Sequence, residues 1–185
     1  MVHGIHSVEG NNNMSVLWPY LQRSLPGYTV ALFSYGFMGF WQARWRNKRQ
    51  AQRLAESLDD GDIIVTHSNG AAIAYLAVRD YGARPEGIIN INPALDRWLS
   101  ADVPWVETIH SDGDRWVWLS QWIPGHIWGD QGKVGYKGKA TNVINHNASK
   151  FGGVMAYDGH TCLFESVRIH LWARFIAHRI MERME

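Results

Sequence analysis

Residues 62–78, with the sequence DIIVTHSNGAAIAYLAV, constrain the fold more than any other stretch of this chain. Residues 63–65 are β-branched and apolar, which is typical of a buried strand. Residues 71–78 are apolar on every side and rich in good helix formers, which predicts a buried helix. Ser68 lies in the middle of the short turn between them. A turn this sharp lifts a serine hydroxyl clear of the sheet and places it near the N–H groups that begin the helix.

Strand-like and helical segments alternate along the whole chain, which predicts a mostly parallel sheet of about six strands in a three-layer α/β/α sandwich. A short strand is expected to end at Val2. The other expected strands are residues 28–35, 63–65, 87–91, 105–110 and 142–145. Helices are expected from the N-cap residues Ser15 and Asn47, over residues 71–82 and 115–123, and over 161–183. Residues 36–46 and 124–139 are expected to be loops, and residues 1–185 to form one domain.

The composition excludes several classes of protein. The net charge of +1 predicts no strong attraction to nucleic acid or to an anionic membrane. The single cysteine, Cys162, cannot form an intramolecular disulfide and is typical of a reducing compartment. We find neither a secretory signal pattern nor an apolar run of membrane-spanning length, so we expect a cytoplasmic protein.

Chemically active residue types follow several of the expected strands. In parallel sheets the functional residues gather beyond the carboxyl ends of the strands. Ser68 follows the third expected strand, Asp114 the fifth and His160 the sixth. Glycine-containing turns surround Asp114 and His160, so we expect these three side chains at one edge of the sheet.

Four short motifs resemble those of the α/β-hydrolase superfamily, most closely its small esterases and lipases without a cap domain. They are VHGI at residues 2–5, THSNG at 66–70, GDRWV at 113–117 and GHTCL at 159–163. The resemblance implies a triad in which Ser68 is the nucleophile, His160 the base and Asp114 the acid. It also implies an oxyanion hole formed by the backbone N–H groups of Ile5 and Asn69, and no cofactor. This sequence departs from the pattern at Thr66, where the family usually has glycine.

Other residues compete for these roles. Asp112 is nearer the strand end than Asp114, but the glycine after it is typical of a turn, and the motif register favours Asp114. His146 competes with His160, but it lies close to its strand and lacks a preceding glycine turn. Two groups of residues resemble metal sites, but we predict no metal. By the family resemblance, His3 and His67 of the first group brace the oxyanion turn and the serine turn, and the second group has no recognised ligand spacing. These groups are His3, His6 and His67, and His110, Asp112, Asp114 and His126.

The predicted function is hydrolysis of carboxylic esters, small or polymer-linked, through an acyl-enzyme. A thioesterase or amidase would use the same residues, and a binding protein could keep the fold without turnover. Few residues separate the expected strands at 87–91 and 105–110, where capped relatives insert a lid, so we expect an open groove. Six tryptophans between Trp98 and Trp128 are expected to form core and to line this groove.

Overall fold

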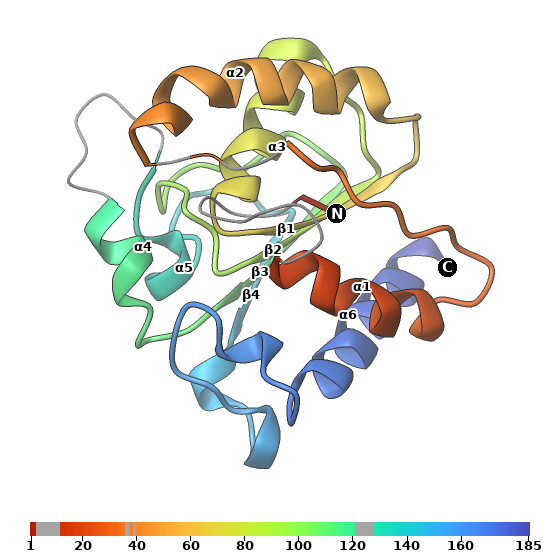
Figure 1. Cartoon of the computed structure of the whole chain (residues 1–185), viewed down its shortest axis with the longest axis vertical. Coiled ribbons are helices and arrows are strands. Elements are labelled where there is room, and N and C mark those ends of the chain that lie inside the picture. Colours follow the sequence, from red (N-terminus) through yellow and green to blue (C-terminus); the bar gives the residue numbers. More distant parts are fainter. Residues whose placement is uncertain (3–11, 36–37, 39, 121–127) are drawn as a thin grey trace.

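A computed structural model describes residues 1–2, 12–35, 38, 40–120 and 128–185. At its centre is a parallel sheet with the strand order β1-β2-β3-β4 (Figure 1). The strands are β1 (Ile63–His67), β2 (Gly87–Ile91), β3 (Trp105–His110) and β4 (Val143–Asn147). Because all four run in the same direction, their carboxyl ends meet at one edge, and the segments that follow them are neighbours.

The described sheet has four strands, where we expected about six. Val2 lies beside β1 and forms isolated parallel bridges with Thr66 and with Phe33. The expected strand over residues 28–35 is wrong, since only Phe33 pairs with the sheet. Leu32 is 41% exposed, so this apolar run borders the sheet without being buried in it. Residues 3–11, which would extend the chain from Val2, lie outside the described part.

Helices cover both faces of the sheet, as the alternating pattern predicted. α2 (Phe40–Ser57) packs on α3 (Asn69–Tyr81), and α1 (Asn13–Ser24) packs on α6 (Ile169–Met184) (Figure 1). Ile64 and Ile88 belong to the hydrophobic core beneath α2 and α3. Val65 and Ile89 belong to the core beneath α1 and α6. Successive strand residues therefore bury opposite faces, and the three-layer architecture is confirmed.

Two expected helix starts are wrong, and in each case a polar side chain has a different partner. Asn12 is the N-cap of α1, because its Oδ1 accepts from the Ser15 N–H at 2.9 Å and its own N–H donates to Ser15 Oγ at 3.0 Å. Ser15 is thus the inner half of a capping box. α2 begins at Phe40, so the expected loop over residues 36–46 is already helical from residue 40. Asn47 lies inside α2, where its buried amide bonds to Asn69.

The short elements follow the prediction in part. α4 (Arg115–Ser120) lies within the expected helix, but α5 (Gln131–Val134) interrupts the segment expected to be a loop. The final helix begins at Ile169, not at residue 161, because the backbone of Glu165 is extended. Three 3-10 turns precede it, at Ala148–Lys150, Gly153–Met155 and Cys162–Phe164. None of the described helices has the length and hydropathy that a membrane crossing requires.

Candidate active site

Ser68 occupies the predicted sharp turn between β1 and α3. Its backbone has φ 55° and ψ −122°, and only Asn92 shares a positive φ among the described residues other than glycine. Hydrogen bonds hold this conformation. The Ser68 N–H donates to the Ile91 carbonyl at 3.1 Å, and the Ser68 carbonyl accepts from the N–H groups of Ala71 and Ala94 at 3.1 and 3.0 Å. Such a backbone costs about 1–3 kcal/mol and persists because the surrounding structure imposes it.

Thr66 replaces the glycine of the family pattern without leaving the strand. It is fully buried in β1, where it pairs with Asn90 in the register of β2. Its hydroxyl donates to Asn90 Oδ1 at 2.7 Å. The β-branched side chain is therefore used to join two strands just before the turn.

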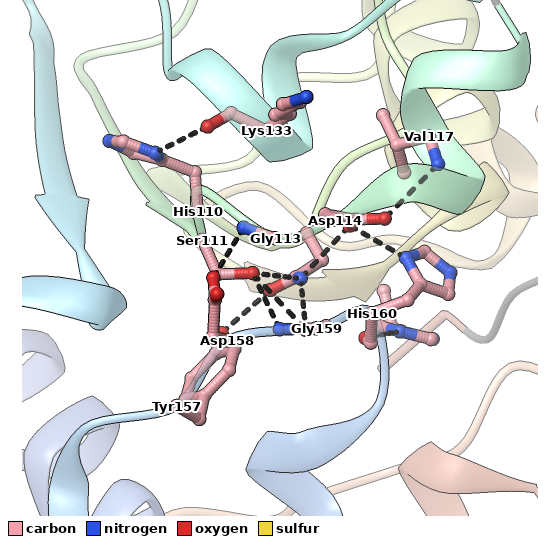
Figure 2. Close-up of polar contacts among 12 residues, drawn as sticks. His110, Ser111, Gly113, Asp114, Val117, Lys133, Tyr157, Asp158, Gly159 and His160 are labelled. Atoms are coloured by element: carbon pink, nitrogen blue, oxygen red, sulfur yellow. Dashed lines mark hydrogen bonds and ion pairs between the residues drawn. The ribbon is translucent and has the colours of Figure 1, made fainter.

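Asp114 and His160 are brought together, as predicted (Figure 2). Asp114 is fully buried, and its Oδ2 accepts a hydrogen bond from His160 Nδ1 at 2.8 Å. Its Oδ1 accepts from the Val117 N–H at 3.1 Å. Because an ionised carboxylate only accepts, Nδ1 of His160 is the donor in this bond, and in the neutral imidazole this arrangement leaves the lone pair on Nε2. This is the tautomer that a general base requires.

The environment of Asp114 favours its charged form. Burial raises the pKa of this carboxyl, but the hydrogen bond and charge of His160 lower it, with help from the Val117 N–H and the Asn92 amide. The balance leaves the pKa of Asp114 below its ordinary value. The carboxylate is therefore ionised at neutral pH and can stabilise an imidazolium at His160.

Asn92 is a site residue that sequence reasoning missed. It is fully buried at the end of β2, with φ 44°. Its Nδ2 donates to Asp114 Oδ2 at 3.0 Å and to the Gly159 carbonyl at 2.9 Å, and its Oδ1 accepts from the Tyr157 hydroxyl at 2.6 Å. Asn92 thus ties the turn of Asp114 to the turn of His160. The sequence did carry one signal for Asn92. It is a polar residue directly after β2, the strand that lies between β1, which leads to Ser68, and β3, which leads to Asp114.

Ser111 makes a second tie between the same two turns (Figure 2). Its hydroxyl donates to the Gly159 carbonyl at 3.2 Å and accepts from the Gly159 N–H at 3.1 Å. The Asp158 carboxylate also accepts from the Gly113 N–H. These contacts fix His160 relative to Asp114 through the backbone as well as through their side chains.

The serine turn lies beside the histidine turn. His67, the residue before Ser68, donates from Nε2 to the His160 carbonyl at 3.2 Å, and the two imidazole centroids are 4.8 Å apart. Within the part of the chain that the structure describes, no hydrogen bond joins Ser68 Oγ to His160. Catalytic hydrogen bonds are often loose without substrate and tighten when it binds.

Asn69 is the described member of the expected oxyanion hole. As the first residue of α3, it has a backbone N–H without an acceptor inside the helix. Its side chain is held by Asn47, at 2.8 and 3.0 Å, and by the Trp128 indole N–H at 2.7 Å. The backbone at Asn69 is therefore anchored from two sides. Ile5, the other expected donor, lies outside the described residues.

The competing residues have other partners. Asp112 is exposed and accepts from Asn147 Nδ2 at 3.0 Å, and His146 bonds to the buried Glu107 at 2.8 Å. Among the described residues, no three His, Cys, Asp or Glu side chains are grouped as metal ligands. His3, His6 and His126 of the two metal-like groups lie outside this part of the chain. Of the six expected tryptophans, Trp122 lies outside the described residues. Trp105 and Trp128 are buried in the core, and Trp98, Trp116 and Trp118 are exposed.

Solved structures share this fold at low sequence identity. The esterase domain of a Rhodothermus marinus protein superposes with a TM-score of 0.57 and 13% identity, over 98% of this chain and 85% of that one. A putative YdeN-like hydrolase from Pectobacterium atrosepticum superposes with a TM-score of 0.53 and 14% identity, over 99% and 91%. The sequence itself matches no protein-family model, and no curated protein matches it. The likeness shows that the chain has the fold of these hydrolases.

Proposed function

We propose that this protein is a serine hydrolase that cleaves carboxylic esters through an acyl-enzyme. The observation that carries the proposal is the hydrogen bond from His160 Nδ1 to the buried Asp114, formed beside the strained turn at Ser68. A buried carboxylate that orients a histidine next to a serine in such a turn matches the roles that acyl transfer needs. The structural neighbours named esterase and hydrolase support the same class.

The proposed reaction uses each group in turn. Ser68 Oγ attacks the ester carbonyl carbon while His160 Nε2 takes the hydroxyl proton, and Asp114 stabilises the resulting imidazolium. The N–H groups of Asn69 and Ile5 bind the oxyanion, and one such donor typically contributes about 3 kcal/mol of barrier lowering. The carbon–oxygen bond of the ester then breaks, and His160 returns the proton to the leaving alcohol. Water hydrolyses the acyl-enzyme by the same steps.

The substrate is proposed to be a small or polymer-linked ester that enters an open groove. The chain between β2 and β3 spans residues 92–104, which is too short for a folded lid domain. Trp98 and Trp116, in the segments after β2 and β3, are 62% and 73% exposed, and we propose that their apolar surface lines this groove. A thioester or amide would fit the same catalytic groups, so the leaving group is to be decided by assay.

The test is Ser68→Ala, assayed with p-nitrophenyl esters of graded chain length and with a fluorophosphonate probe, which labels only an activated serine. We expect loss of turnover and of labelling in a folded protein. Ser57→Ala, on α2, is the matched control and should keep both. Near-wild-type turnover in folded Ser68→Ala protein, or a label mapped to another serine, would refute the proposed mechanism.

A further inference from the structure

A surface hollow of about 520 Å³, distinct from the serine turn, lies at the carboxyl ends of β3 and β4. We call it the basic pocket. Four cationic side chains line it together with one imidazole and one carboxylate. These are Arg97, Lys133, Lys137, Lys150, His110 and Asp112. The chain has 18 basic and 17 acidic residues, so this local excess of positive charge is not a property of the whole surface.

The positive charge in the basic pocket is only partly offset by neighbouring groups. Arg97 is paired with the buried Asp130, and Lys133 lies over the Trp118 ring at 5.6 Å. Lys137 and Lys150 are exposed, and no carboxylate among the described residues forms an ion pair with either of them. The carboxylate of Asp112 is already hydrogen-bonded to Asn147. Two lysines therefore face the hollow with their charge available to a ligand.

The floor of the basic pocket is held in one arrangement. Gly135 has φ 73°, and a Cβ at this position would lie 2.9 Å from both Asn145 Oδ1 and His110 Nε2. The Asn145 amide accepts from the Tyr136 N–H at 2.8 Å and donates to the Tyr136 carbonyl at 2.9 Å. These contacts fix the segment that carries Lys137 against β4. Little backbone entropy would therefore be lost when a ligand binds, and the main ordering cost would fall on the lysine side chains.

We propose that the basic pocket binds a multiply charged oxyanion of the phosphate class. Lysine ammonium groups bind phosphate as compact point charges, and charge-assisted hydrogen bonds of this kind are among the strongest in proteins. The pocket lies two to three strands from the end of β1, so the anion would be about 10–14 Å from Ser68. At that separation it is either a phosphate carried by an extended ester substrate or a free phosphate bound beside the active site.

His110 offers a local reporter of binding. Its Nδ1 donates to the Lys133 carbonyl at 3.2 Å, which holds the imidazole against the residues that line the pocket. Burial holds the pKa of His110 below its ordinary value; the Lys133 carbonyl and Asp112 raise this pKa, whereas Lys137 and Lys150 lower it. An anion bound between the lysines would offset their charge and raise the pKa of His110.

The binding experiment uses the full chain at low ionic strength. Inorganic phosphate and pyrophosphate are titrated into the protein, with sodium chloride of equal ionic strength as the reference, while NMR follows the His110 imidazole. We expect saturable binding, a rise in the pKa of His110, and at least about tenfold weaker binding in Lys137→Ala/Lys150→Ala. The control Lys48→Ala/Arg49→Ala removes the same charge from exposed positions of α2 and should bind as wild type does.

Two results would overturn the anion site. One is equal weakening in both double variants, and the other is a response to phosphate no larger than the response to chloride. The source of the anion is then decided with a phosphate-bearing ester and a neutral ester. A selective loss of kcat/KM for the phosphate-bearing ester in Lys137→Ala/Lys150→Ala assigns the anion to the substrate, and equal kcat/KM values with lost phosphate binding assign a free anion. The titration measures binding and needs no turnover, so its result can be interpreted even if the Ser68 mechanism is wrong.

Discussion

Replacing Asn92 by alanine should weaken the fold and the site together. The substitution removes the hydrogen bonds to Asp114, to the Gly159 carbonyl and from the Tyr157 hydroxyl. Each such bond contributes about 1 kcal/mol net, and the buried Tyr157 hydroxyl, left without its acceptor, adds a desolvation penalty. Alanine also tolerates the φ of 44° less well than asparagine does. Together these losses should lower the free energy of unfolding by about 3–5 kcal/mol.

For a chain of this length that loss corresponds to a decrease in Tm of roughly 6–20 °C, measured by circular dichroism at neutral pH. Two comparison variants separate the contributions. Tyr157→Phe removes only the bond to Asn92 Oδ1 and should cost about 1–2 kcal/mol. Asn142→Ala, which removes a single bond to the Val103 carbonyl near the start of β4, should cost about 1 kcal/mol.

The activity of Asn92→Ala is measured well below its own Tm, where the variant is folded. We expect a reduced kcat, because neither Asp114 nor the turn of His160 keeps its full set of contacts. If the Tm of Asn92→Ala lies within about 2 °C of wild type, the loss of stability is less than about 1 kcal/mol for a chain of this size, and the role assigned to Asn92 is refuted. A destabilisation no greater than that of Asn142→Ala would refute it as well.

Three further predictions concern the acid, the pH response and access to the site. Asp114→Asn should lower kcat by orders of magnitude, because His160 loses its acceptor and its charge partner, whereas Asp112→Asn should stay near wild type; the reverse ranking in folded variants would contradict the assignment. Burial raises the pKa of Glu107, but hydrogen bonds from His146 and Arg179 lower it from 4.5 to about 2, so its stabilising contribution is complete above pH 4.5 and lost as the pH falls toward 2. The Tm difference between wild type and Glu107→Gln should therefore shrink over that range, and a constant difference would argue against the ion-pair cluster. The rate against the concentration of a short-chain ester should be hyperbolic, and a sharp rise at the solubility limit would reveal a lid.

The parts of the fold that could be predicted are those in which sequence pattern and burial agree. β1, β2 and β3 are buried on both faces, and each contains a short stretch of β-branched or aromatic apolar residues; their alternation with helices predicted the layers. The run at residues 28–35 has the same composition but lies at the border of the sheet, and composition alone does not distinguish the two. Asn47 and Ser15 look like caps because they favour helix starts, and only tertiary contacts show that Asn47 instead bonds to Asn69.

The candidate site was predictable where a residue follows a strand directly or stands in a short motif. This covers Ser68, Asp114 and His160, whose interpretation as a triad stays a prediction. Asn92 also follows its strand directly but stands in no motif, and its role could not be identified because it depends on contacts with residues 22 and 67 positions later in the chain. The lysines of the basic pocket are likewise scattered along the sequence and meet only when α5 and the turn after β4 come together.

The backbone at Ser68 has a consequence for how activity and stability trade against each other. A φ of 55° with a ψ of −122° is a conformation that glycine adopts freely and that serine adopts only under constraint. In the described structure, the Ser68 side chain forms no hydrogen bond that offsets the cost of this backbone conformation. A Ser68→Gly chain should therefore fold at least as firmly while losing the proposed nucleophile, which is the pattern expected where a residue serves chemistry at the expense of the fold. If the proposed mechanism holds, selection for heat resistance alone would favour loss of the Ser68 side chain, so a screen for stabilised variants should also measure ester turnover.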